Sequence, residues 1–205
     1  MPKNSVRLDN LKHVSASEET NRDEDLILRL LPMARSFDIY DIASISVSDI
    51  SVADWVRLKC KYGCSRYGTS WCCPPETPDS DRMRTILKGY ERALLLSGRV
   101  KNGQFYRENS SKRRIQVKRW KGPVALEREL FLAGYYKAFS LVSETCALCR
   151  ECAYPRKCAF PMYRRPSVES CSIDILGTLR NIGRAFQIAG DVNEEYASYS
   201  LILLD

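Results

Sequence analysis

Four cysteines within thirteen residues are the strongest chemical signal in the chain. They are Cys146, Cys149, Cys152 and Cys158, in the run CALCRECAYPRKC. A turn can aim three thiolates at one point when they are spaced two residues apart, as in the cysteine runs that hold iron–sulfur clusters. We therefore predict that these four residues bind a [4Fe–4S] cluster. Cys171 competes with Cys158 for the fourth position.

Zinc is the main alternative, because four thiolates also form a closed tetrahedral site. Four-cysteine zinc sites more often use two separated Cys-x2-Cys knuckles, whereas here three cysteines follow one another at that spacing. The spacing favours iron–sulfur chemistry. A zinc-binding structural or interaction module remains the alternative.

A second group of four cysteines lies upstream, in the run CKYGCSRYGTSWCC. Adjacent side chains diverge, so we do not expect Cys72 and Cys73 to bind one metal together. The predicted ligands are Cys60, Cys64 and one of the pair, and a fourth could come from Cys171. A three-cysteine site with an open position could accept a substrate, by analogy with catalytic zinc sites, and a closed structural site is the alternative.

Composition agrees with metal ligation. The chain has 205 residues and nine cysteines, and an odd count argues against a fully paired disulfide framework. The N-terminus has no apolar signal core and no apolar stretch could span a bilayer, so we expect a cytoplasmic protein with reduced thiols and no membrane partner. The one histidine, His13, lies in the polar N-terminal segment, so we expect ligation by cysteine alone.

Two basic groups suggest partners, and the net charge is +7. The stretch 107–121 combines basic residues with Trp120 and could grip nucleic acid, although a solvated helix face is the favoured interpretation. A second group surrounds the downstream cysteines and could dock an acidic redox partner protein. Its members are Arg150, Arg156, Lys157, Arg164 and Arg165.

These cysteines must be positioned by regular elements, and the pattern predicts an α/β fold, with a mixed sheet, helices packed on it and two cysteine-rich metal-binding loops. Residues 1–23 are expected to be disordered, and 24–205 to form a single metal-binding domain. The spacing predicts helices at 25–36, 78–90 and 123–136 and within 173–189. Strands are predicted at 43–47, 52–59, 93–100, 139–143 and 196–204.

Four segments in the same order resemble a prokaryotic family of predicted metal-binding proteins, domain of unknown function twenty-two eighty-four. They are CKYGCSRYGTSWCCPP, LERELFLAGYYKAFSL, CALCRECAYPRKC and RRPSVESCSIDI, and the resemblance covers roughly residues 25 to 205. It implies a metal or iron–sulfur role for Cys73 rather than Cys72, together with Cys60, Cys64, Cys146, Cys149, Cys152 and Cys158. Cys171 lies where members of the family vary, which leaves Cys171 or Cys72 as the fourth ligand of the upstream site.

The function predicted from these observations is that of an iron–sulfur protein with one cluster or two, in electron transfer or as a redox accessory to a partner enzyme. The family has no agreed reaction, so the resemblance identifies ligands and leaves catalytic residues unassigned.

Overall fold

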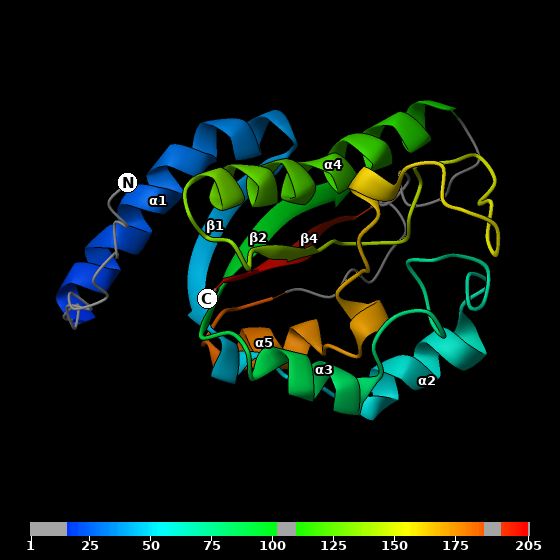
Figure 1. Ribbon diagram of the computed structural model, residues 1–205, viewed down its shortest axis with the longest axis horizontal. Helices are drawn as coiled ribbons and strands as arrows, with labels where there is room; N and C mark the ends of the chain where they lie inside the picture. Colours follow the sequence, from blue (N-terminus) through cyan, green and yellow to red (C-terminus); the bar gives the residue numbers. More distant parts are fainter. Residues whose placement is uncertain (1–15, 102–109, 187–193, 205) are drawn as a thin grey trace, which may run out of the picture.

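The computed structural model describes residues 16–101, 110–186 and 194–204 (Figure 1). The longer elements follow the chain in this order: α1 (Ala16–Ser36), β1 (Ile39–Ser46), α2 (Asp54–Gly63), α3 (Ser80–Leu87), β2 (Arg92–Lys101), α4 (Ser110–Leu132), β3 (Phe139–Leu141), α5 (Ile175–Asn181) and β4 (Glu195–Leu204). Three short 3-10 helices complete the description: η1 (Val47–Asp49), η3 (Pro161–Tyr163) and η4 (Glu169–Cys171).

The four strands form one sheet in the order β1-β2-β4-β3, and each pair of neighbours is antiparallel. The predicted α/β class is confirmed, but the prediction of a mixed sheet is wrong. The connection through α4 does make β2 and β3 run in the same direction. However, β4 lies between these two strands and pairs antiparallel with both. On the β2 side, Arg92 lies opposite Leu204.

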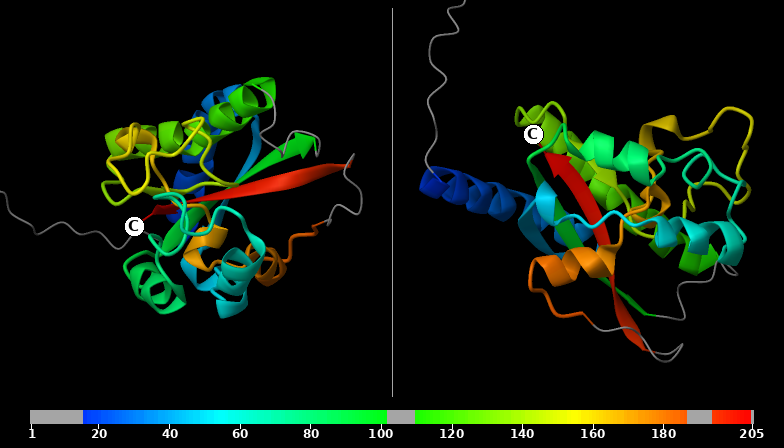
Figure 2. Two further views of the ribbon diagram at one scale, coloured as in Figure 1. Left: turned by 90° about the vertical axis from the view of Figure 1, so that its right-hand side faces the viewer. Right: turned by 90° about the horizontal axis from the view of Figure 1, so that it is seen from below.

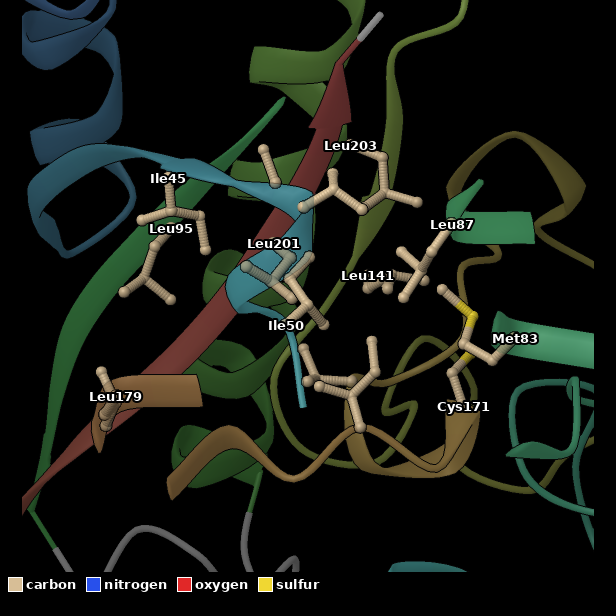
Figure 3. Close-up of a cluster of buried hydrophobic side chains, with 14 residues drawn as sticks. Ile45, Ile50, Met83, Leu87, Leu95, Leu141, Cys171, Leu179, Leu201 and Leu203 are labelled. Atoms are coloured by element: carbon tan, nitrogen blue, oxygen red, sulfur yellow. The ribbon is translucent and has the colours of Figure 1, made fainter. Parts of the chain in front are cut away.

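The central strands are apolar on both faces because helices cover both sides of the sheet. On β2, Leu94 and Leu96 contact the cluster formed with α1 and α4, whereas Ala93 and Leu95 contact the cluster formed with α3 and α5. Figure 1 shows these two helical layers, and Figure 3 shows the second cluster in detail. Burying each large aliphatic side chain contributes about 1.5–3 kcal/mol, so this sheet is a rigid base for the loops at its end.

Most predicted elements are present, with shifted boundaries, but the strand predicted at 52–59 is wrong. This segment begins helix α2, in which Asp54 occupies the favourable first turn. In this helix Trp55 and Leu58 are exposed, and Val56 is the buried residue. Helical spacing then places Cys60 four residues after Val56, on the same side of α2.

The start of the helix predicted at 123–136 is also wrong. Helix α4 begins at Ser110, and Pro123 lies inside it. Pro123 cannot donate to the carbonyl one turn earlier, but its own carbonyl accepts a hydrogen bond from Ser140 Oγ at 2.9 Å. The basic stretch therefore forms the first half of a long helix as far as it is described, from residue 110, and residues 107–109 lie outside the description.

At the N-terminus, residues 1–15 of the segment predicted to be disordered lie outside the described residues. Residues 16–23 form the first turns of helix α1. No described helix has the length and apolar character needed to cross a membrane.

Candidate metal centre

The two cysteine-rich segments lie side by side at one end of the molecule (Figures 1 and 2). The upstream run, Cys60–Cys73, starts on the last turns of α2 and continues through the loop toward α3. The downstream run, Cys146–Cys158, lies in irregular chain between β3 and η3. Only the downstream run is wholly a loop, so the prediction of two loops is corrected for Cys60, which is helical.

Arg57 of α2 holds the chain that follows the upstream run. Its guanidinium donates to the carbonyls of Thr77 and Pro78 over 3.0–3.3 Å, and Thr77 Oγ1 donates to the carbonyl of Ser170 at 2.6 Å. The loop between α2 and α3 is thus fastened both to its own helix and to η4.

A tight turn presents the two adjacent cysteines. The backbone N–H of Cys72 donates to Ser70 Oγ and that of Cys73 donates to the Ser70 carbonyl, each at 3.2 Å. Gly68 has φ +68°, which a side chain would strain, and its N–H donates to the Pro74 carbonyl at 2.8 Å. This turn buries both cysteines and leaves Cys64 exposed.

The downstream run is anchored on α4 by polar side chains from the basic stretch. Arg113 donates to the carbonyls of Ala147 and Leu148 at 3.0 and 2.8 Å. Gln116 donates to the Thr145 carbonyl at 3.0 Å. The chain that carries Cys146 and Cys149 is therefore held by hydrogen bonds from a helix, although it has no regular structure of its own.

Other side chains of the basic stretch also point toward the protein. Arg119 forms a buried ion pair with Glu144, at 2.8 Å, and Trp120 donates to the Tyr163 carbonyl at 2.8 Å. Lys118 pairs with Asp38 at 2.8 Å. Arg119 and Trp120 are thus engaged inside the protein, whereas the Lys118–Asp38 pair lies at the surface.

The two runs are joined to each other. Trp71 donates from Nε1 to the Arg156 carbonyl at 2.9 Å, and its ring meets that of Tyr154 edge-on, with centroids 5.1 Å apart. The Tyr154 hydroxyl in turn donates to Glu76 at 2.9 Å. Residues about eighty positions apart thereby form one structural unit.

Cys60, Cys64 and Cys73, the predicted upstream ligands, share one feature of the structure. All three line one cavity of about 680 Å³. Burial, followed by the nearby thiols of Cys64 and Cys60, raises the pKa of Cys73 to about 11, while Ser70 and Arg66 act in the opposite direction. The pKa of Cys60 is raised for similar reasons, by burial first and then by Cys64 and Glu169.

The downstream thiols also share one neighbourhood. Burial raises the pKa of Cys149, and the charges of Cys146, Cys152 and Cys158 raise it further. The backbone N–H of Phe160 donates to Cys158 Sγ at 3.4 Å. The four residues predicted to hold the cluster are thus neighbours in the fold.

Cys72 contacts Cys146 of the downstream run. A hydrogen bond with the Cys146 side chain raises the pKa of Cys72 most, followed by burial and by the nearby thiols of Cys146, Cys73 and Cys158. The sequence showed that the two adjacent side chains must diverge, but it did not show which way Cys72 points.

Cys171 joins neither group in this structure. It is fully buried in the hydrophobic cluster beneath the sheet, in the same part of the core as Met83 (Figure 3). Burial raises its pKa to about 12, and the side chains that also influence it are Ser170, Arg57 and Glu169. This placement does not support Cys171 as the fourth ligand of either site.

The donor chemistry of both groups fits a thiolate-bound metal or cluster. All nine cysteines are free, and thiolates are the ligands that zinc and iron–sulfur clusters prefer. In the described part of the chain, no three Cys, His, Asp or Glu side chains already surround a common point as bound ligands would. Metal binding therefore requires the thiols of each group to turn toward one another.

The cavity beside the upstream thiols combines one cation with aromatic and acidic groups. Arg66 lies in its wall together with Tyr67, and β4 contributes Tyr196 and Tyr199. Glu169 also lines it, and burial raises the pKa of this carboxyl. Sequence reasoning did not identify Arg66 or the two tyrosines of β4, because residues so far apart show no spacing pattern.

The fold and the paired thiol groups define a cysteine-rich α/β protein of the metal-binding class. The family model described as "Predicted metal-binding protein (DUF2284)" matches residues 43–204, and the chain belongs to this family, as the resemblance implied. No curated protein and no solved structure matches the chain significantly.

Proposed function

We propose that this metal-binding protein is an iron–sulfur protein that transfers electrons, alone or as a redox accessory to a partner enzyme. Cys146, Cys149, Cys152 and Cys158 hold a [4Fe–4S] cluster in this proposal. The observation that carries it is the shared neighbourhood of these four thiols around Cys149, in a spacing suited to a cluster. A bound cluster supplies reversible one-electron chemistry.

The chain's own residues position and tune this centre. Arg113 fixes the backbone of the downstream run and acts on Cys149 in the sense that favours its thiolate. The N–H of Phe160 donates to the sulfur of Cys158. Hydrogen bonds and positive charge at cluster sulfurs favour the reduced form, so both groups raise the reduction potential.

The upstream thiols Cys60, Cys64 and Cys73 form a second metal site that faces the cavity of about 680 Å³. Three thiolates leave a coordination position open, as in catalytic metal sites. A small molecule in the cavity would then lie beside the metal, with Arg66 and the tyrosines of β4 available to contact it.

The surface near the downstream run suits an acidic redox partner protein. Arg150, Arg156 and Lys157 are exposed around it. Complementary charge of this kind steers encounter more than it adds affinity, so the association rate should fall as salt is raised.

Anaerobic purification followed by iron, acid-labile sulfide and zinc analysis tests the proposal. We expect a brown protein with about four iron and four sulfide in the downstream centre. Cys149→Ala should remove this iron and the colour. Cys171→Ala is the matched control, because its thiol lies in the core outside both groups, and it should keep them.

A colourless protein with stoichiometric zinc and no sulfide would contradict the redox proposal. It would favour the alternative, a zinc-binding structural or interaction module. Cys149→Ala with unchanged metal content would remove Cys149 from the ligands under either interpretation.

A further inference from the structure

The adjacent residues Cys72 and Cys73 have separate surroundings, and no sequence pattern explains which way each points. Cys72 is 3% exposed and belongs to a small apolar cluster against which Cys146 packs. The other members of this cluster come from α4 and the downstream segment: Trp120, Val124, Val142 and Leu148.

Cys73 has different neighbours. It lines the large cavity with Cys60 and Cys64, and Cys72 is not part of that lining. The hydrogen bonds of both backbone N–H groups to Ser70 fix the turn between the two cysteines. The hydrogen bond from Trp71 to the Arg156 carbonyl holds this turn next to the downstream run. Both orientations are therefore fixed by contacts outside the cysteines themselves.

We propose that Cys72 is a ligand of the downstream centre, where it takes the fourth position interchangeably with Cys158, while Cys73 serves the upstream centre. This inference rests on the proposed function. It gives the downstream centre five thiols for four cluster positions, of which Cys72 is the most deeply buried and Cys158 is only partly buried. It differs from the expectation that Cys72 could complete the upstream site.

One consequence is that a single peptide unit links the two centres. If both groups hold metal, the cavity-facing centre and the centre beside the basic surface are connected through the covalent bonds of this peptide unit.

Cluster retention in a Cys158→Ala background tests the assignment. Cys158→Ala alone should keep iron, sulfide and the visible absorption, because Cys72 still supplies the fourth thiolate. Adding Cys72→Ala leaves three thiols and should release most of the downstream iron. Adding Cys73→Ala instead, the matched control one residue away, should leave the downstream iron and sulfide unchanged and remove only upstream metal.

Two results would overturn the assignment: loss of the cluster from Cys158→Ala alone, or equal downstream iron in the two double variants. A second readout needs no metal. In the reduced, metal-free full chain, a mild oxidant should join Cys72 to Cys146 in preference to Cys60 or Cys64, as mapped by peptide mass spectrometry. Cys72 crosslinked mainly to Cys60 or Cys64 would overturn it.

The two readouts separate this inference from the proposed function. Wild-type protein without iron and sulfide would contradict the iron–sulfur proposal. The Cys72–Cys146 crosslink tests the placement of Cys72 whether or not the protein binds a cluster.

Discussion

The indole of Trp71 donates a hydrogen bond to the backbone carbonyl of Arg156 at 2.9 Å, and this bond joins the two cysteine runs. Tyr154, two residues before Arg156, packs edge-on against the same indole. The guanidinium of Arg164 lies over the indole ring, 5.5 Å from its centroid. One tryptophan thus joins the two cysteine runs, which contain eight of the nine cysteines.

Replacing Trp71 with Phe should loosen this junction, because the ring contact survives but the hydrogen bond is lost. A neutral hydrogen bond of this kind contributes about 1 kcal/mol, so opening of the junction should become about fivefold more frequent. Amide hydrogen exchange of residues 146–160 measures that change. Trp55→Phe on α2 is the control, and equal exchange in both variants would contradict the role assigned to Trp71.

Glu127 links the downstream segment to the sheet. Its carboxylate accepts from Arg165 Nε at 2.9 Å and from the Ser140 N–H at 2.7 Å. Burial would raise the pKa of Glu127, but these hydrogen bonds from Arg165 and Ser140 outweigh it and lower the pKa. Glu127→Gln should lower the free energy of unfolding by on the order of 3 kcal/mol at pH 7, because a mostly buried arginine loses its partner.

The lowered pKa fixes the sign of the pH dependence. The carboxylate stabilises the fold above its unfolded-state pKa of about 4.3, and this contribution is lost as pH falls through the lower native pKa. The difference between wild type and Glu127→Gln in urea unfolding should therefore shrink below about pH 4. Glu129→Gln, on an exposed position of the same helix, should change stability by no more than about 0.5 kcal/mol. A difference that persists unchanged at low pH would refute the assignment.

The sequence predicted the strands well where they contain uninterrupted apolar runs, ALLL at 93–96 and LILL at 201–204, which are buried on both faces of the sheet. It failed at VADWVRLK, most of which forms helix α2, with the apolar residues Trp55 and Leu58 exposed. It also placed the start of α4 at Pro123, since proline usually opens a helix, whereas here the helix continues through it.

For the site, spacing divided the cysteines into two runs, and the resemblance chose Cys73 over Cys72 for the upstream group. It could not predict that Cys72 turns away from Cys73 toward Cys146, which depends on Trp71 and Ser70 and their distant partners. It likewise could not separate Cys171 from the ligands, because burial in the core comes from tertiary packing alone.

Cys171 should resist alkylation in the folded protein. Burial raises its pKa to about 12, so the thiolate fraction at pH 8.5 is lower than that of an ordinary cysteine by about three orders of magnitude. Metal-free protein treated with iodoacetamide should label exposed Cys64 rapidly and Cys171 only on unfolding, as quantified by peptide mass spectrometry. Labelling of Cys171 as fast as that of Cys64 in native protein would show that it lies outside the core.

Neighbouring residues of α4 offer a comparison between a buried and an exposed ion pair. Arg119 and Glu144 are 2.8 Å apart with side chains 5% and 7% exposed, whereas Lys118 and Asp38 are 2.8 Å apart with side chains 45% and 29% exposed. Glu144→Gln should lower the free energy of unfolding by about 3–5 kcal/mol, because Arg119 stays buried without a countercharge. Asp38→Asn should cost at most about 1 kcal/mol, and asparagine tolerates the φ of 62° found at that position.

Urea unfolding at 0.1 M and 0.5 M salt measures both losses, and only the exposed pair is expected to weaken as salt rises. Equal losses in the two variants would mean that water reaches Glu144, and the wall of the cavity beside Cys73 would then be open to solvent at that point.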